Sequence, residues 1–263
     1  MAQVVLVSGG ARGIGRAVVE RLAGAGWQVA MTYLPGVEDP APLAQALQTL
    51  PVSLHPLDLR DPASIRTCQA DVVARHGGID ALVNNAAVGS ATVTAFGPDQ
   101  DAQDAAMLAI NATGTLTMCR SFLAQPAASP GATRKIVNLS SVGGGIATFP
   151  GFSLSDGMSK AAVAHLTRQL AAEAAHSPLD VFALCPGATD TEMFRQSTLN
   201  HLSPDQRARF LEGLPKGRLI APSEIAEVVA FLLSPAGAVL HGAVIDASLG
   251  LGVRPGLVSE SRH

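Results

Sequence analysis

The residues best suited to acid–base chemistry lie between positions 140 and 160. Ser140-Ser141 follows an apolar run, and Lys160 heads a stretch with helical spacing. Asp156 stands four residues before Lys160, and residues i and i+4 share one face of a helix. A hydroxyl, a carboxyl group and an ammonium group that meet at one point can polarise a substrate and move its protons. The spacing therefore predicts that Asp156 and Lys160 lie on one helix face, where the carboxylate could act as a base or only cap the helix.

A second candidate site is a glycine-rich turn near the start of the chain. The run Gly9-Gly10-Ala11-Arg12-Gly13-Ile14-Gly15 joins an apolar stretch to a helical one. Small residues let the backbone approach a pyrophosphate, and the N-terminus of the following helix offers free N–H groups. An ordinary strand–helix turn could have this composition too. The position of the run, at the first such turn of an alternating chain, favours a dinucleotide site.

A parallel sheet is needed to position these two sites. Short runs rich in Val, Ile and Leu predict strands at Val4–Ser8, Gln28–Tyr33, Val52–Leu57, Ala81–Asn84, Lys135–Leu139, Val181–Leu184 and Ala243–Ile245. Helical spacing predicts helices at Ile14–Ala25, Pro62–Arg75, Gln103–Ala124, Met158–Ala175 and Ser223–Leu233. This alternation is typical of a single Rossmann-type α/β domain, a doubly wound parallel sheet with helices on both faces.

The predicted domain covers residues 1–252. Residues 192–218 interrupt the alternation and are expected to form a helical insertion above the sheet edge where ligands bind, and residues 253–263 a C-terminal tail. Arg195, Arg207 and Arg209 within this insertion favour an anionic substrate, unless the insertion is simply a solvated helical hairpin.

Composition narrows the classes of function. A net charge of −3 leaves no basic surplus for nucleic acid. No apolar run reaches the roughly 18 residues of a membrane span, and the chain opens on an apolar strand without a cationic leader. Three widely spaced cysteines indicate reduced thiols rather than disulfides or a zinc site. We therefore expect a cytoplasmic protein that acts on a small molecule without a bound metal.

Further motifs follow in order along the chain. They are Asp58-Leu59 after the third strand, Asn84-Asn85-Ala86-Ala87 ending the fourth, Asn111 in Asn111-Ala112-Thr113-Gly114, Ser140-Ser141 ending the fifth, Ser159-Lys160, and Pro186-Gly187 with Thr189 and Thr191 after the sixth. With the glycine run, they resemble the short-chain dehydrogenase/reductase family up to about Gly252. The resemblance implies a nicotinamide dinucleotide held by Gly9, Arg12, Gly13, Ile14, Gly15, Tyr33, Asp58, Leu59, Asn85, Ala86, Lys160, Pro186, Gly187, Thr189 and Thr191. It also implies that residues 192–218 form a substrate lid and that the protein is a homodimer or homotetramer.

The choice of cofactor depends on the end of the second strand. An NAD enzyme usually places an acidic residue there to bind the ribose 2′-hydroxyl, and this chain has Tyr33. Without a carboxylate to repel a 2′-phosphate, Arg12 can pair with that phosphate. Leu34 stands where NADP members often carry a basic residue, and Arg12 could equally be a solvated loop cation. The balance favours NADP(H) over NAD(H).

The family's acid–base residue is absent. The resemblance implies a tyrosine four residues before the lysine, a serine on the substrate carbonyl and an asparagine that holds a relay water. The only tyrosine is Tyr33, and Asp156 occupies the expected position. The loop from Ser141 to Asp156 is also about two residues longer than is usual, and an alignment from Phe149 would place Ser155 there instead. Since residues i and i+4 share a helix face, Asp156 is the residue expected in the place of the tyrosine. The resemblance then implies a catalytic set of Asn111, Ser141, Asp156 and Lys160.

Asp156 allows several functions. An aspartate has an ordinary pKa of about 3.9, and a neighbouring ammonium lowers it, so a carboxylate is expected rather than a proton donor. Such a carboxylate suits an NADP(H)-dependent oxidoreductase that reduces an imine or iminium C=N bond, or another acceptor that needs no phenol. The alternatives are a dehydratase, isomerase or cyclase with Asp156 as base, and an inactive partner protein. Asp156 could also merely cap its helix, in a capping box with Ser153, and pair with Lys160.

Overall fold

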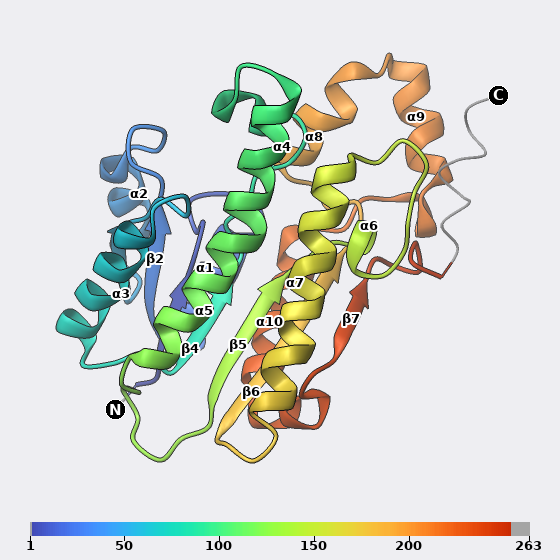
Figure 1. Ribbon diagram of the computed structural model, residues 1–263. Helices are drawn as coiled ribbons and strands as arrows, with labels where there is room; N and C mark the ends of the chain where they lie inside the picture. Colours follow the sequence, from blue (N-terminus) through green and yellow to red (C-terminus); the bar gives the residue numbers. More distant parts are fainter. Residues whose placement is uncertain (1, 254–263) are drawn as a thin grey trace.

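The fold is built on one parallel sheet. The computed structural model describes residues 2–253, which form a seven-stranded sheet in the order β3-β2-β1-β4-β5-β6-β7 (Figure 1). The strands are β1 (Val4–Val7), β2 (Gln28–Tyr33), β3 (Val52–Pro56), β4 (Ala81–Asn84), β5 (Arg134–Leu139), β6 (Leu179–Pro186) and β7 (Val244–Ala247). The predicted strands are confirmed, with end positions that differ by two residues or fewer.

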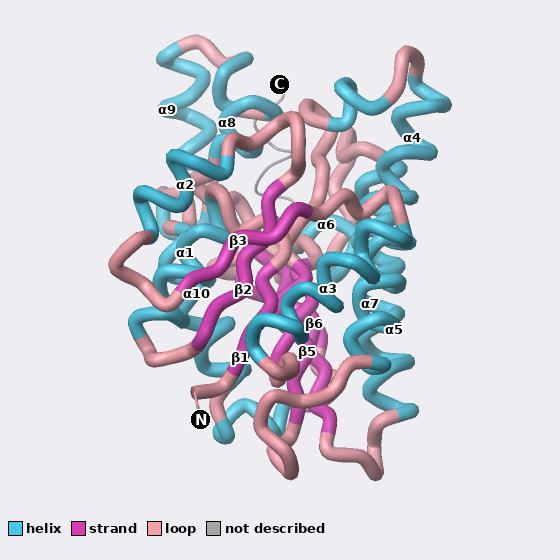
Figure 2. Tube along the Cα trace, turned by 90° about the vertical axis from the view of Figure 1, so that its left-hand side faces the viewer, coloured by secondary structure: helices cyan, strands magenta, loops and turns pink. Residues whose placement is uncertain are grey.

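Helices cover both faces of the sheet, which confirms the predicted doubly wound class (Figure 2). One face packs against α3 (Pro62–His76), α4 (Gln100–Leu108), α5 (Thr115–Ala124) and α7 (Leu154–Glu173). The other face packs against α1 (Gly13–Gly24), α2 (Pro40–Leu47) and α10 (Pro222–Leu233). Successive residues of β1 alternate between these two buried layers, so the strand is apolar throughout.

The predicted helix 103–124 is not continuous. A π-helical turn, Ala109–Gly114, separates α4 from α5. Such turns widen the helix locally and recur at functional sites. Here the turn carries Asn111, whose side chain holds the backbone of Val88 from the segment after β4. Periodicity alone could not show this interruption, because both halves keep helical spacing.

Two helix starts differ from the prediction. Helix α2 was not predicted, although Asp39 caps it by accepting a hydrogen bond from the Ala41 N–H at 2.9 Å and Pro40 follows. This Asp-Pro pair was a readable start signal. Helix α7 begins at Leu154, four residues before the expected Met158, because Ser153 caps it.

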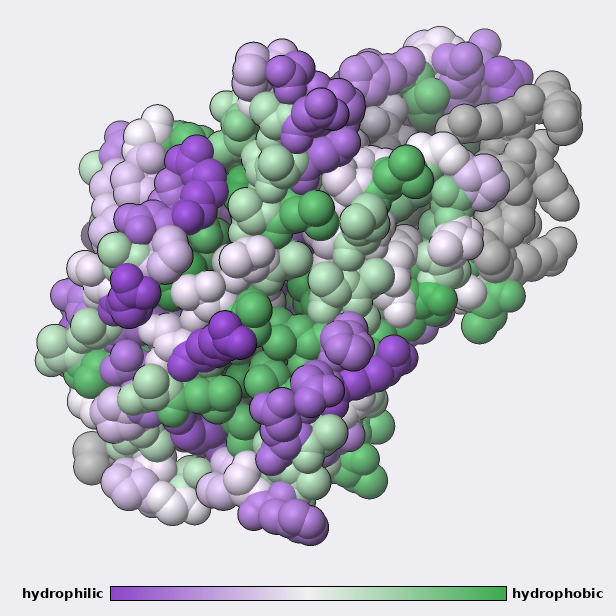
Figure 3. All heavy atoms as spheres, viewed as in Figure 1, coloured by the Kyte–Doolittle hydropathy of each residue, from purple (hydrophilic) through white to green (hydrophobic). Residues whose placement is uncertain are grey.

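Residues 192–218 form a helical arm beyond the carboxyl ends of the strands. It contains α8 (Glu192–Ser197), a 3₁₀ turn at Leu199–His201, α9 (Pro204–Gly213) and a second 3₁₀ turn at Pro215–Gly217. Hydrophilic residues gather on the upper surface near α4 and α9, whereas apolar ones gather over α5 and α7 (Figure 3). Among the helices described, none is long and apolar enough to cross a membrane. The predicted tail 253–263 lies, apart from Val253, outside the described residues.

Candidate active site

The main cavity has a volume of about 960 Å³ and lies beyond the carboxyl ends of the strands. Open α/β sheets bind their ligands at this edge, where the strand order reverses, and here it reverses between β1 and β4. The cavity wall includes these predicted site residues: Gly9, Arg12, Gly13, Ile14, Tyr33, Asp58, Leu59, Asn85, Ala86, Ser141, Asp156, Lys160, Pro186, Gly187, Thr189 and Thr191. Gly15 and Asn111 do not line it.

The glycine turn leaves bare backbone on the cavity wall. Gly9 and Gly13 have φ angles of +67° and +55°, which side-chain-bearing residues rarely adopt. A Cβ atom at Gly15 would collide with the carbonyl oxygen of Gly9, so this glycine permits the tight turn although it lies outside the cavity. Helix α1 begins at Gly13 and directs its free N–H groups to the same place. This shape and polarity fit a dinucleotide pyrophosphate.

Ser8 and Asn85 join the glycine turn to β4. The Ser8 hydroxyl oxygen accepts hydrogen bonds from the N–H groups of Asn85 and Ala86, both at 3.0 Å. The Asn85 side chain donates to the carbonyl oxygen of Gly9 at 2.9 Å. Ser8 was not predicted as a site residue, and its position at the end of the first strand was the available signal. These contacts fix the floor of the cofactor region.

Glu38 corrects the expectation that no carboxylate stands near the end of β2. The chain turns back after Leu34, and Glu38 accepts a hydrogen bond from the Leu34 N–H at 2.9 Å. Its other oxygen lies 3.9 Å from Nε of Arg12, and both side chains line the cavity. The sequence prediction considered only the strand end and missed this turn.

Asp58 is held in a fixed orientation by Arg60. One Asp58 oxygen accepts from the Arg60 backbone N–H at 2.9 Å and from Nε at 3.0 Å. These bonds lower the pKa of Asp58, so the side chain is an ionised acceptor. Leu59 lies beside it on the wall, and both positions agree with a role in binding the cofactor.

Ser141 and Lys160 both line the cavity. Ser141 begins the short helix α6 (Val142–Gly145) and accepts a hydrogen bond from the Gly143 N–H at 3.2 Å. The neighbouring Ser140 hydroxyl donates to the Lys160 carbonyl oxygen at 2.8 Å and so anchors α7 to the end of β5. Burial lowers the pKa of Lys160, and the charge of Asp156 opposes this shift only in part.

The Asn111 side chain bonds to the segment after β4 and to α7. Its side-chain oxygen accepts from the Val88 N–H at 2.9 Å, and its nitrogen donates to the Val88 carbonyl at 2.9 Å and to the Ser159 hydroxyl at 3.2 Å. The residue is only 2% exposed. Its side chain ties three segments together outside the cavity.

Asp156 differs from expectation in two ways. Ser153 caps α7 by accepting from the Asp156 N–H at 3.4 Å, but within the described chain the reciprocal bond of a capping box and an ion pair with Lys160 are both absent. One carboxyl oxygen, Oδ1, is buried without a hydrogen-bond partner among the described residues. Burial therefore raises the pKa of Asp156 despite the nearby lysine, which corrects the predicted lowering.

The substrate side of the cavity is largely apolar. Its wall includes Met193, Phe194, Phe210 and Leu214 from the arm, together with Phe149, Phe152 and Leu251. The arginines expected to attract an anion are not on this wall, and Arg195 pairs with Asp190 at 2.8 Å. The prediction of an anionic substrate therefore finds no support in this lining.

Comparisons with known proteins place the chain in a family. The family model described as enoyl-(acyl carrier protein) reductase matches residues 9–252. The chain is 33% identical to 2-(S)-hydroxypropyl-CoM dehydrogenase 3 of Xanthobacter autotrophicus, covering 95% of this chain and 96% of the relative. It is 35% identical to acetoacetyl-CoA reductase of Shinella zoogloeoides, covering 95% and 98%.

Solved structures of known proteins have the same fold as this chain. A single-residue variant of the actinorhodin polyketide ketoreductase with NADPH aligns with a TM-score of 0.83 at 29% identity, over 95% of this chain and 97% of that one. The Pseudomonas aeruginosa RhlG/NADP complex aligns with a TM-score of 0.82 at 27% identity, over 96% and 97%. With the glycine turn and the Ser141–Lys160 wall, these matches define a nicotinamide-dependent oxidoreductase. The chain belongs to the short-chain dehydrogenase/reductase family.

Proposed function

We propose that this oxidoreductase uses NADP(H) to reduce a C=N bond, or another acceptor that needs no tyrosine acid, with Asp156 as the proton-handling group. The observation that supports this proposal is the Asp156 carboxyl group itself. It lines the same cavity as Ser141 and Lys160, and its Oδ1 has no partner among the residues described.

Because burial raises its pKa, Asp156 is protonated to a greater extent than an ordinary aspartate at the same pH. When bound, the nicotinamide dinucleotide supplies the hydride for the substrate carbon. The O–H bond of Asp156 breaks as an N–H bond forms at the imine nitrogen. The carboxylate that remains then stabilises the iminium cation in an apolar cavity, where electrostatic interactions are strong.

The other side chains of the site position the reactants. Lys160 is suited to hold ribose hydroxyls through its ammonium group, and Thr191 stands next to the glycine turn, where it also caps α8. Ser141 offers a hydroxyl to the substrate heteroatom. A carboxyl group reaches roughly 3 Å less far than a phenol, so the substrate must lie close to α7.

Support for NADP(H) comes from Arg12, whose side chain is 57% exposed on the cavity wall, and from the NADP(H) complexes of the two structural neighbours. Glu38 works against a 2′-phosphate because it lies beside Arg12. Replacing Glu38 by Gln is expected to tighten NADPH binding and leave NADH binding nearly unchanged.

The test is turnover of a panel of cyclic imines and the matching ketones with NADPH. Replacing Asp156 by Ala or Asn is expected to lower imine reduction by at least about 100-fold, the usual contribution of a general acid. Glu173→Gln, at the far end of the same helix, is the matched control and should be unaffected. Unchanged kinetics in both Asp156 variants would contradict the proposal.

A non-redox enzyme with Asp156 as base is the second candidate, favoured by the same unpartnered carboxyl oxygen. Such an enzyme would isomerise or dehydrate its substrate in the absence of NADPH. An inactive partner protein would catalyse neither this reaction nor imine reduction.

A further inference from the structure

The ring of Phe152 lies against Gly143, and the residue is 37% exposed. A Cβ atom built on Gly143 would lie 2.9 Å from Cζ of Phe152, closer than real side chains come, and 3.1 Å from both Cε atoms. On Gly157, such an atom would lie 3.5 Å from Cδ1 of the same ring, which is an ordinary van der Waals contact. Gly143 follows Ser141 by two residues, and Gly157 directly follows Asp156. The ring therefore lies between the segment after Ser141 and the start of α7.

Beside this ring, the backbone of α6 lies very close to that of α7. Gly144 has a φ angle of +93°, and a Cβ atom there would collide with the Gly157 carbonyl oxygen. The run Gly143-Gly144-Gly145 thus brings the backbone of α6 directly against the first turn of α7. The Phe152 N–H donates to the Phe149 carbonyl oxygen at 3.1 Å and fixes the turn that carries the ring.

We propose that Phe152 is a positioning residue whose ring forms the wall of the main cavity beside Asp156 and keeps water away from its carboxyl group. The proposal rests on the function given above for Asp156. Phe152, Asp156 and Ser141 all line this cavity, and Asp156 Oδ1 is buried.

This wall accounts for the electrostatics of the site. Removing water from a carboxyl group disfavours its ionised form, and burial is the largest cause of the raised Asp156 pKa. The opposing attraction from Lys160 is smaller. If the backbone alone buried the carboxyl group, the identity of residue 152 would not affect its proton affinity.

The experiment is a pH titration of the Asp156 carboxyl group by carbon-13 NMR in the full-length protein, with Asp156→Asn used to assign the signal. Phe152→Ala is expected to lower the pKa of Asp156 toward its ordinary value, because water reaches the group. Phe152→Leu should retain most of the wild-type value, since it keeps an apolar wall. Val239→Ala is the matched control, because Val239 is 87% exposed and does not line the cavity.

Gly143→Ala provides a second route if Phe152→Ala does not fold, because its methyl group displaces the ring and should shift the pKa in the same direction. An unchanged Asp156 pKa in either variant would overturn the proposal. The titration needs no substrate, so it is independent of the reaction. If the variants lower the pKa of Asp156 but the wild-type protein reduces no imine, the role of Phe152 is supported. The function proposed for Asp156 is then refuted.

Discussion

Asp156 and Lys160 share one face of α7, yet for each of them burial outweighs the attraction between the two groups. At the scale of the residue, most residues of the motifs line the cavity, although Asn111 and Gly15 do not. The motifs could not give the ionisation of Asp156, because that depends on Phe152 and on glycines that carry no charge. Glu38 was missed for a similar reason, since a turn that the strand pattern does not show carries it to Arg12.

The raised pKa of Asp156 predicts a pH-dependent penalty on stability. Below pH about 4, the carboxyl group is protonated in both the folded and the unfolded state, and the penalty is absent. As the pH rises, the unfolded state ionises first, so the folded state loses stability until the pH passes the folded-state pKa. Asp156→Asn should therefore stabilise the protein at pH 8 by on the order of 1 kcal/mol and have little effect near pH 4. Melting curves at the two pH values measure this, and a destabilised variant at pH 8 would contradict it.

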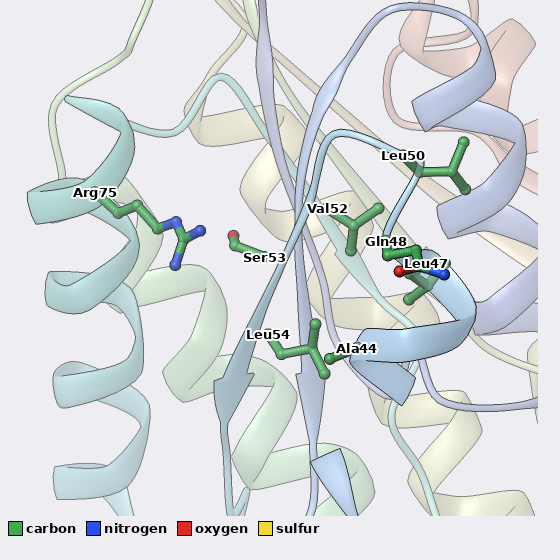
Figure 4. A pocket seen from close by; sticks show the side chains of 8 residues that line it. All are labelled: Ala44, Leu47, Gln48, Leu50, Val52, Ser53, Leu54 and Arg75. Carbon is green, nitrogen blue, oxygen red and sulfur yellow. The ribbon is translucent and has the colours of Figure 1, made fainter. Parts of the chain in front are cut away.

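At the scale of the element, side chains of β3 and α3 form a polar cluster. The Ser53 hydroxyl lies 2.8 Å from Nε2 of both His55 and His76, and Nδ1 of His55 lies 2.6 Å from Asp71. A smaller cavity of about 320 Å³ opens beside this strand, with Arg75 extending toward Ser53 (Figure 4). Burial is the largest cause that lowers the pKa of both histidines.

The lowered pKa values of the two histidines predict that the protein loses stability as the pH falls. The raised pKa of Asp156 predicts a loss of stability as the pH rises. Above about pH 6.5 both histidines are neutral in either state, and as the pH falls the unfolded state takes up protons first. The melting temperature of the wild type should therefore fall between pH 7 and pH 5. His76→Gln removes one of the two groups and should flatten this slope, whereas a slope equal to that of the wild type would rule the cluster out as its source.

Element prediction from sequence succeeded where burial on both faces makes a strand uniformly apolar. It failed at the π-helical turn 109–114, because that break results from the hydrogen bonds of Asn111 to Val88, a contact distant in sequence. The start of α7 was misplaced because the helix begins at the Ser153 cap with the exposed Leu154, which belongs to no buried apolar face.

At the scale of the whole molecule, exposed apolar residues on α5 and α7 suit an interface between copies of the chain. We propose a homo-oligomer formed through these two helices. Leu154 and Met158 are 85% and 61% exposed on α7, and Leu123 is 40% exposed on α5. Apolar residues gather on this face (Figure 3). Met158→Glu should lower the mass measured by light scattering from that of an oligomer to that of one chain. A monomeric wild type would contradict the proposal.

The main cavity should be a working nicotinamide site despite the absent tyrosine, because the glycine turn and the residues around it are complete. Calorimetric titration of the purified protein with NADPH and, separately, with NADH tests this before any substrate is known. We expect saturable binding of both, tighter for NADPH, and the same affinities in Asp156→Asn, which leaves the cofactor region intact. Absence of binding for both dinucleotides would show that the cavity is not a cofactor site.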